Sequence, residues 1–110
     1  MIEKTMKEIR ARVEKQGGVT PEAKKDLLDL ITKLESEIDR LSAIDSDHAQ
    51  SIAGFIERSA HEATREKKHP ELLKISLEGL SESVKGFEAS HPDLVAEINN
   101  ICTVLANMGV

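Results

Sequence analysis

Apolar residues recur every three or four positions along most of the chain, with polar and charged residues between them. This spacing places the apolar side chains on one side of an α-helix. Five consecutive segments carry such a stripe, and short connections between them favour antiparallel neighbours. The pattern predicts an all-α fold, an antiparallel helical bundle of about five helices with heptad-like, coiled-coil-like packing. We expect a single domain over 1–110, with helices at about 2–16, 20–42, 47–67, 70–87 and 91–108.

Helix boundaries are marked by glycine, proline and small polar residues. Thr20 offers an N-cap oxygen directly before Pro21, which suits the first position of a helix. Gly17–Gly18 is predicted to connect the first two helices, and Gly109 to cap the last one. Ser90 is predicted as the N-cap of the last helix. Each boundary therefore has a local signal.

The predicted third helix carries small residues on its apolar side, which predicts a close approach by a neighbouring helix. These residues are Ala49, Ala53, Ala60 and Ala63, with Gly54 nearby. The first two helices instead carry narrow stripes rich in Ile and Leu. Those stripes either close a hairpin within the chain or pair with another chain, so a homodimer is one of the two expectations.

One eight-residue signal, Glu-x-x-His-Pro-acid-Leu-apolar, occurs at 66–73 and again at 88–95. Glu and His three residues apart on a helix are the ligands that di-iron bundles take from two of their helices. The candidate metal ligands are therefore Glu66, His69, Glu88 and His91. A metal-binding bundle, with iron or zinc, is the first alternative for function.

A proline directly after each histidine favours a different interpretation of this repeat. Proline disfavours the helical conformation at the residue before it and is frequent at the first helical position. Each histidine is therefore expected at a helix boundary rather than inside a helix. At the first copy the alternative is one long helix, formed by the third and fourth segments together and bent at Pro70. The inward stripes of the other helices are also almost purely aliphatic. We therefore interpret the repeat as two helix-junction signals and predict no metal site and no cofactor.

The third helix also presents a charged side, which contains Glu57, Arg58, His61, Glu62 and Arg65. The segment from His61 begins like the His-Glu-x-x-His helix of zinc proteases, but Arg65 stands where the second ligand belongs. We interpret this side as an exposed polar face. A regulatory protein that binds a partner through this face is the second alternative for function.

Catalytic signatures are missing from the sequence. No Gly-rich phosphate loop follows a strand, and no serine has an evident His and acid partner. We expect no enzyme, and we expect the helical serines to face solvent. These are Ser51, Ser59, Ser76, Ser81 and Ser83.

Composition narrows the partners and the compartment. The formal charge is -5, from 20 Asp and Glu against 15 Lys and Arg, and the aromatic residues are two Phe. A net negative charge and few stacking rings argue against nucleic acid binding. No apolar run is long enough for a membrane span, so we expect a cytoplasmic protein without membrane contact. Cys102, the single cysteine, is expected to be a small buried apolar residue.

The end of the chain resembles a known family. The segment 87–92, Phe-Glu-Ala-Ser-His-Pro, followed by Leu-Ala-Asn-Met-Gly at 105–109, is similar to the closing signature of short bacterial helical proteins classified as a domain of unknown function. The segment 22–41 resembles that family more loosely, and the segment 44–73 resembles a longer middle segment found in only some of its members. The resemblance implies a bacterial, all-helical, non-enzymatic protein. It also marks a helix junction or an interaction surface at Phe87, Glu88, Ser90, His91 and Pro92.

These observations specify an architecture more closely than an activity. The leading hypothesis is a non-catalytic structural or protein-interaction module that self-associates, most simply as a dimer. An unknown protein partner is also compatible with the sequence.

Overall fold

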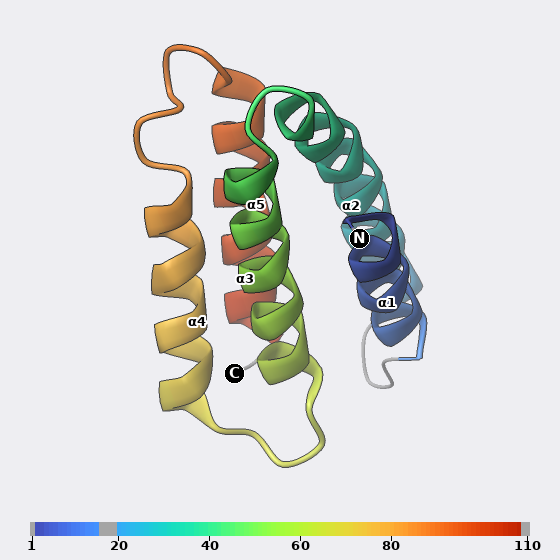
Figure 1. Ribbon diagram of the computed structural model, residues 1–110. Helices are drawn as coiled ribbons and strands as arrows, with labels where there is room; N and C mark the ends of the chain where they lie inside the picture. The colour runs from blue at the N-terminus through green and yellow to red at the C-terminus, as the bar shows by residue number, and fades with distance from the viewer. Residues whose placement is uncertain (1, 16–19, 109–110) are drawn as a thin grey trace.

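The computed structural model describes residues 2–15 and 20–108, which form five α-helices and no β-strand (Figure 1). Helices that follow one another along the chain run in opposite directions (Figure 1). The predicted all-α fold with five helices is confirmed. The predicted connector at Gly17–Gly18 and the predicted cap at Gly109 lie outside the described residues. The helices are α1 (Ile2–Glu14), α2 (Pro21–Ser42), α3 (Ser46–Thr64), α4 (Pro70–Ser83) and α5 (Pro92–Met108).

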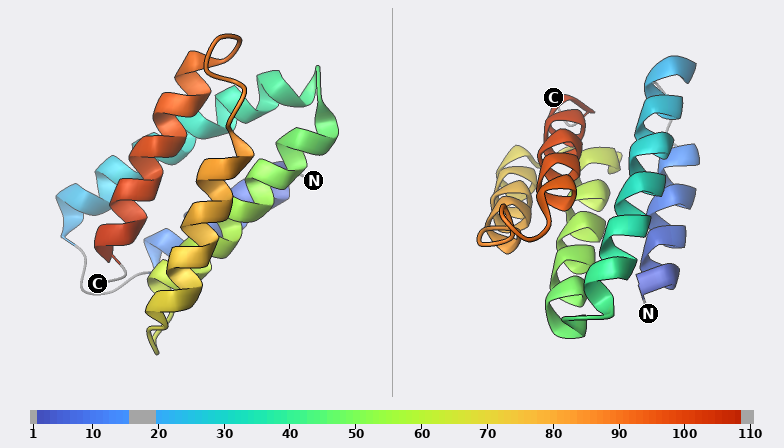
Figure 2. Two further views of the ribbon diagram at one scale, coloured as in Figure 1. Left: turned by 90° about the vertical axis from the view of Figure 1, so that its left-hand side faces the viewer. Right: turned by 90° about the horizontal axis from the view of Figure 1, so that it is seen from above.

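Helix α3 occupies the middle of the bundle and contacts each of the other four helices. Helices α1 and α4 lie at opposite edges, as the view from above shows (Figure 2). Among the described residues, α1 contacts only α2 and α3, and α4 contacts only α3 and α5. Each edge helix therefore keeps one side away from the rest of the chain.

The core consists of the aliphatic stripes that the sequence pattern picks out. The stripe of α2 is at most 1% exposed, and Met6, Ile9 and Val13 of α1 are buried to the same degree. Of the two expectations for these stripes, packing within the chain is the one observed. The α2 stripe comprises Leu27, Ile31, Leu34, Ile38 and Leu41, and the main α5 residues in the core are Leu94, Ile98, Ile101 and Leu105.

The small residues of α3 pack closely, as predicted, because its four alanines are almost completely buried. Gly54 does not share this role, since a Cβ built there would meet no described atom within 4 Å. A close approach between α3 and α4 depends instead on Gly79 of α4, which faces the ring of Phe55. The expectation that Gly54 serves helix packing is therefore wrong.

Helix α3 ends at Thr64, three residues before the predicted end at 67. Arg65 is extended, with φ -67° and ψ 147°, and the Lys68 ammonium donates a hydrogen bond to the carbonyl of Ala63 (2.5 Å). A cation at this position satisfies a terminal carbonyl and complements the helix dipole. The chain then reverses before Pro70, so α3 and α4 are two separate helices (Figure 1).

Helix α4 ends at Ser83, although the stripe predicts a helix as far as Phe87. Gly86 has a φ of +94°, a left-handed conformation that glycine adopts without steric cost. The apolar pattern continues past Val84, which remains buried beyond the helix. The predicted end at 87 is therefore wrong, because core contacts at 84 and 87 are made from a turn.

Candidate functional site

The first copy of the repeated signal begins α4. His69 occupies the N-cap position, and its Nδ1 accepts a hydrogen bond from the backbone N–H of Leu72 (3.3 Å). Pro70 holds the first helical position, and Glu71 lies in the first turn, where an anion suits the helix dipole. Here the histidine acts as a helix cap.

The second copy begins α5 at Pro92. Because the helix starts there, His91 is the residue directly before it, and the His91 carbonyl accepts the first backbone hydrogen bond, from Val95 (3.2 Å). The Ser90 hydroxyl lies 3.0 Å from His91 Nδ1. Ser90 is therefore a neighbour of the residue before the helix, and the prediction that it caps α5 is wrong.

The two Glu and His pairs do not come together in one site. Glu66 and His69 lie in the α3–α4 connection, whereas Glu88 and His91 lie in the α4–α5 connection at the opposite end of α4 (Figure 1). Glu88 accepts a hydrogen bond from the backbone N–H of Gly86 (2.8 Å). Within residues 2–15 and 20–108, no group of three or more His, Cys, Asp or Glu side chains is arranged to hold a metal ion.

Phe87 joins three segments at the α4–α5 connection. Its ring meets the edge of His48 at a centroid distance of 4.7 Å and that of His91 at 5.6 Å, both T-shaped. His48 Nε2 lies 2.6 Å from the carbonyl oxygen of Ser83, so the imidazole N–H satisfies a carbonyl at the end of α4. The predicted junction at Phe87 and His91 thus also includes His48, which no local pattern assigned to it.

A polar cavity of about 380 Å³ lies between α1 and α3, and we call it the arginine pocket. The charged side of α3 that the sequence singles out provides most of its lining, but one residue comes from α1. Arg12 Nη1 lies 2.8 Å from His61 Nδ1. The lining residues are Arg12, Gly54, Glu57, Arg58, His61 and Glu62.

The contact with Arg12 links His61 of α3 to α1. An arginine is always protonated and only donates hydrogen bonds, so His61 Nδ1 must accept. His61 Nε2 lies 4.0 Å from Glu62 Oε2. His61 therefore stands between the Arg12 guanidinium and the Glu62 carboxylate.

Glu62 differs from the exposed residue that the sequence suggests, because it is only 8% exposed. Arg65 Nη1 donates a hydrogen bond to its Oε1 at 2.8 Å. A buried carboxylate needs such a partner. The description of this α3 side as a uniformly solvated face is therefore wrong, since α1 packs beside it and Glu62 lies inside.

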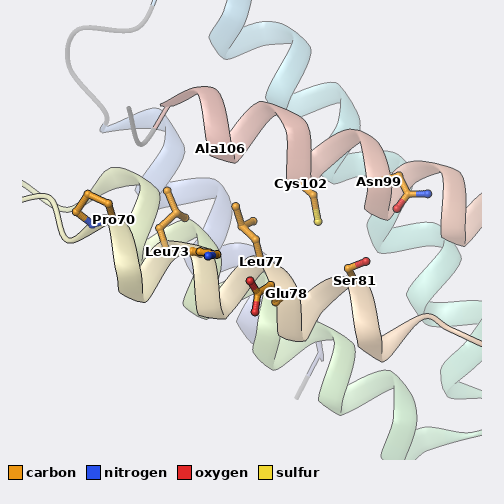
Figure 3. A pocket seen from close by; sticks show the side chains of 9 residues that line it. Pro70, Leu73, Leu77, Glu78, Ser81, Asn99, Cys102 and Ala106 are labelled. Atoms are coloured by element: carbon orange, nitrogen blue, oxygen red, sulfur yellow. The ribbon is translucent and has the colours of Figure 1, made fainter.

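The second candidate site is an apolar groove of about 470 Å³ between α4 and α5, which we call the α4–α5 groove (Figure 3). Leu73 and Leu77 of α4 face Cys102 and Ala106 of α5 across it. Cys102 is half-buried rather than fully buried, and burial raises the pKa of its thiol. The predicted burial of Cys102 is therefore only partial, because this residue packs against the core and also lines the groove.

In the described part of the chain, five helices surround an aliphatic core, and an apolar groove and a charged pocket lie between helices at its surface. This arrangement is that of an all-helical protein with candidate binding sites. The chain belongs to the family described as Domain of unknown function (DUF4404), whose model matches residues 27–110. The match begins within α2, includes the middle segment 44–73, and leaves α1 outside. No curated protein and no solved structure matches the chain.

The family description and the described residues give no indication of catalysis. A further finding concerns membranes. None of the helices in the described part of the chain has both the length and the apolar character needed to cross a bilayer.

Proposed function

We propose that the protein is a non-catalytic, cytoplasmic interaction module that forms a homodimer through α4. The observation that carries this proposal is a self-complementary segment, Lys74–Glu78, on a helix at the edge of the bundle. The segment reads Lys-Ile-Ser-Leu-Glu. When a second copy runs in the opposite direction, the cation at one end of the segment meets the anion at the other end.

The exposure of α4 supports an interaction there. Leu72 and Ile75 are 40% and 60% exposed, which makes α4 the only helix with large exposed apolar side chains among the described residues. Leu77 instead lines the α4–α5 groove, on the opposite flank of α4 from Ile75. Contiguous exposed apolar surface marks interaction sites more often than isolated exposed residues do.

The position of Ser76 sets the orientation of the segment. Ser76 is 4% exposed, and its hydroxyl donates a hydrogen bond to the carbonyl of Leu72 within the helix (2.8 Å). Successive helical residues turn by about 100°. Lys74 and Glu78, two residues before and after the inward Ser76, therefore both point away from the core, with Ile75 and Leu77 on either side of them.

A second copy fits this arrangement if the two α4 helices cross antiparallel about a two-fold axis at Ser76. Lys74 then lies opposite Glu78 of the second copy, and the Ile75 side chains of the two copies lie on the same side of the crossing. A two-fold interface repeats each contact, because the same patch serves both subunits. Charge and apolar surface are both complementary in this single register.

Charge reversal tests the proposal. Lys74→Glu places two carboxylates opposite each other at both ends of the interface, and Glu78→Lys does the same with two cations. We expect either change to weaken dimerisation by at least about tenfold, because like charges across an interface are unfavourable. The double variant K74E/E78K restores both pairs and should dimerise like the original chain. Sedimentation velocity from micromolar to millimolar concentration measures this.

Two outcomes would overturn the proposal. One is a monomer throughout that concentration range. The other is a double variant that dimerises as weakly as the single variants. Thermal unfolding of each variant is the control for effects on the fold. Lys74 and Glu78 are also neighbours within α4 at i, i+4 spacing. Such a pair contributes only about 0.5 kcal/mol to helix stability.

A further inference from the structure

We infer that the arginine pocket between α1 and α3 binds a small ligand that carries an oxyanion, either a phosphate or a carboxylate. This inference is independent of dimerisation, because α1 and α3 form the pocket and α4 contributes nothing to it. The inference depends on the charges of the lining residues, on the fixed position of Arg12, and on Gly54.

Two guanidinium groups line the pocket. Arg58 makes no hydrogen bond or ion pair within the described part of the chain. Arg12 uses Nη1 to contact His61, and its Nε is buried without a partner among the described residues. Each guanidinium carries five N–H donors in a planar fork, so most of this donor capacity has no partner among residues 2–15 and 20–108.

The remaining charges leave the pocket positive. Glu62 is paired with Arg65 at 2.8 Å, so its charge is compensated within α3. Two cations, Arg12 and Arg58, then stand against one anion, Glu57, in a chain whose formal charge is -5. A locally positive cavity on an acidic protein favours an anionic ligand over a cationic one.

Gly54 gives a second and independent indication of a ligand. A glycine inside a helix costs about 1 kcal/mol relative to alanine, and packing does not require one here, because a Cβ would meet nothing within 4 Å. Backbone conformation does not require one either, since Gly86 is the only described glycine with a positive φ. What the glycine does provide is space, because it lines the pocket.

The size and donor geometry indicate the class of ligand. A volume of about 380 Å³ falls in the range of small-molecule sites, roughly 300 to 1,000 Å³. Planar guanidinium groups bind carboxylate and phosphate oxygens in pairs. A small metabolite with one such group fits both the volume and the charge.

The test uses the full chain, uniformly labelled with ¹⁵N, and two probes, inorganic phosphate and malonate. Each is added at constant ionic strength, with chloride as the reference salt. We expect saturable shifts of the Arg58 side-chain Nε–H and Gly54 backbone N–H signals. The probe that saturates at lower concentration tells whether the site prefers phosphate or carboxylate.

Two variants examine the pocket without removing a buried group. Arg58→Gln should weaken binding by about tenfold, the effect of losing a charged hydrogen-bond donor. Gly54→Leu should fill the cavity, leave the helix content unchanged and weaken binding at least as much. Arg40→Gln is the matched control, because Arg40 is an exposed helical arginine paired only with Glu37.

The result that would overturn the inference is a set of shifts that rise linearly with either probe. Equal binding by the Arg58→Gln and Arg40→Gln proteins would also overturn it. So would full binding by a folded Gly54→Leu protein, because that result would place the anion outside the pocket.

Discussion

Gly79 of α4 lies directly against the ring of Phe55 of α3. A Cβ at position 79 would stand 2.7 Å from Phe55 Cδ1, well inside ordinary van der Waals contact. Helices approach this closely only where one of them lacks a side chain, so Gly79 sets the α3–α4 spacing.

Gly79→Ala is therefore expected to lower the free energy of unfolding by about 1–3 kcal/mol, the usual effect of overpacking. The change runs against helix propensity, which by itself favours alanine by up to about 1 kcal/mol. Urea unfolding followed by circular dichroism measures the difference. In a Phe55→Ala background the clash disappears, and the same substitution should become stabilising.

Gly54→Ala provides the matched control for this prediction. Its Cβ meets no described atom, so the helix-propensity gain of up to about 1 kcal/mol should appear in full. Equal effects at the two glycines would show that the ring of Phe55 does not limit the approach of α4.

His69→Ala is expected to lower the free energy of unfolding by about 0.5–1 kcal/mol, since it removes the N-cap of α4. His69→Asp should recover this loss, because aspartate is a stronger cap and places an anion at the positive end of the helix. Chemical unfolding of both variants tests the role. Glu66→Ala is the control from the same repeat, and a loss as large as that of His69→Ala would contradict the capping role.

Phe87→Ala is expected to cost about 1–3 kcal/mol, because a half-buried ring and two aromatic contacts are lost. Phe87→Leu keeps most of the apolar contact and should cost less. Proton NMR gives a second measurement, since removal of the ring current should move the ring C–H signals of both His48 and His91. Movement of only one histidine would contradict the three-segment junction.

The pKa of the Cys102 thiol, raised by burial, gives a prediction about pH. Half-maximal reaction with iodoacetamide should occur above pH 9.0, the ordinary value for a thiol. A raised folded pKa means that the native state keeps its proton longer than the unfolded state does. The associated stability is therefore complete below the unfolded pKa and is lost as the pH rises through the folded value.

Chemical unfolding at a series of pH values above 9.0 tests whether stability falls as the thiol ionises. The original chain should lose more stability than the Cys102→Ala variant over the same pH interval. A steeper loss in the variant would contradict burial of the thiol in the α4–α5 groove.

Local sequence signals predicted much of the fold because they act within a few residues. The aliphatic stripes, the Thr20 cap and the proline-marked starts of α4 and α5 all follow from spacing along one helix. The C-terminal end of α4 could not be predicted from this spacing. Its apolar period continues into Phe87, while the backbone turns at Gly86.

The arginine pocket was not predicted because its lining combines residues that are far apart in the sequence. Arg12 and His61 are 49 positions apart, and no local pattern pairs them. The burial of two serines was not predicted for a different reason. Ser59 and Ser76 were expected to face solvent but are buried, and a serine such as Ser76 tolerates burial by bonding to its own helix.

The central position of α3 determines how the molecule opens. Because α3 contacts all four other helices, we expect its buried amides to become accessible only when the whole bundle unfolds. The edge helices α1 and α4 have two neighbours each and separate at lower free energy. Amide hydrogen exchange should therefore proceed from both edges inward. The slowest-exchanging group should be the alanine-lined segment between Ala49 and Ala63.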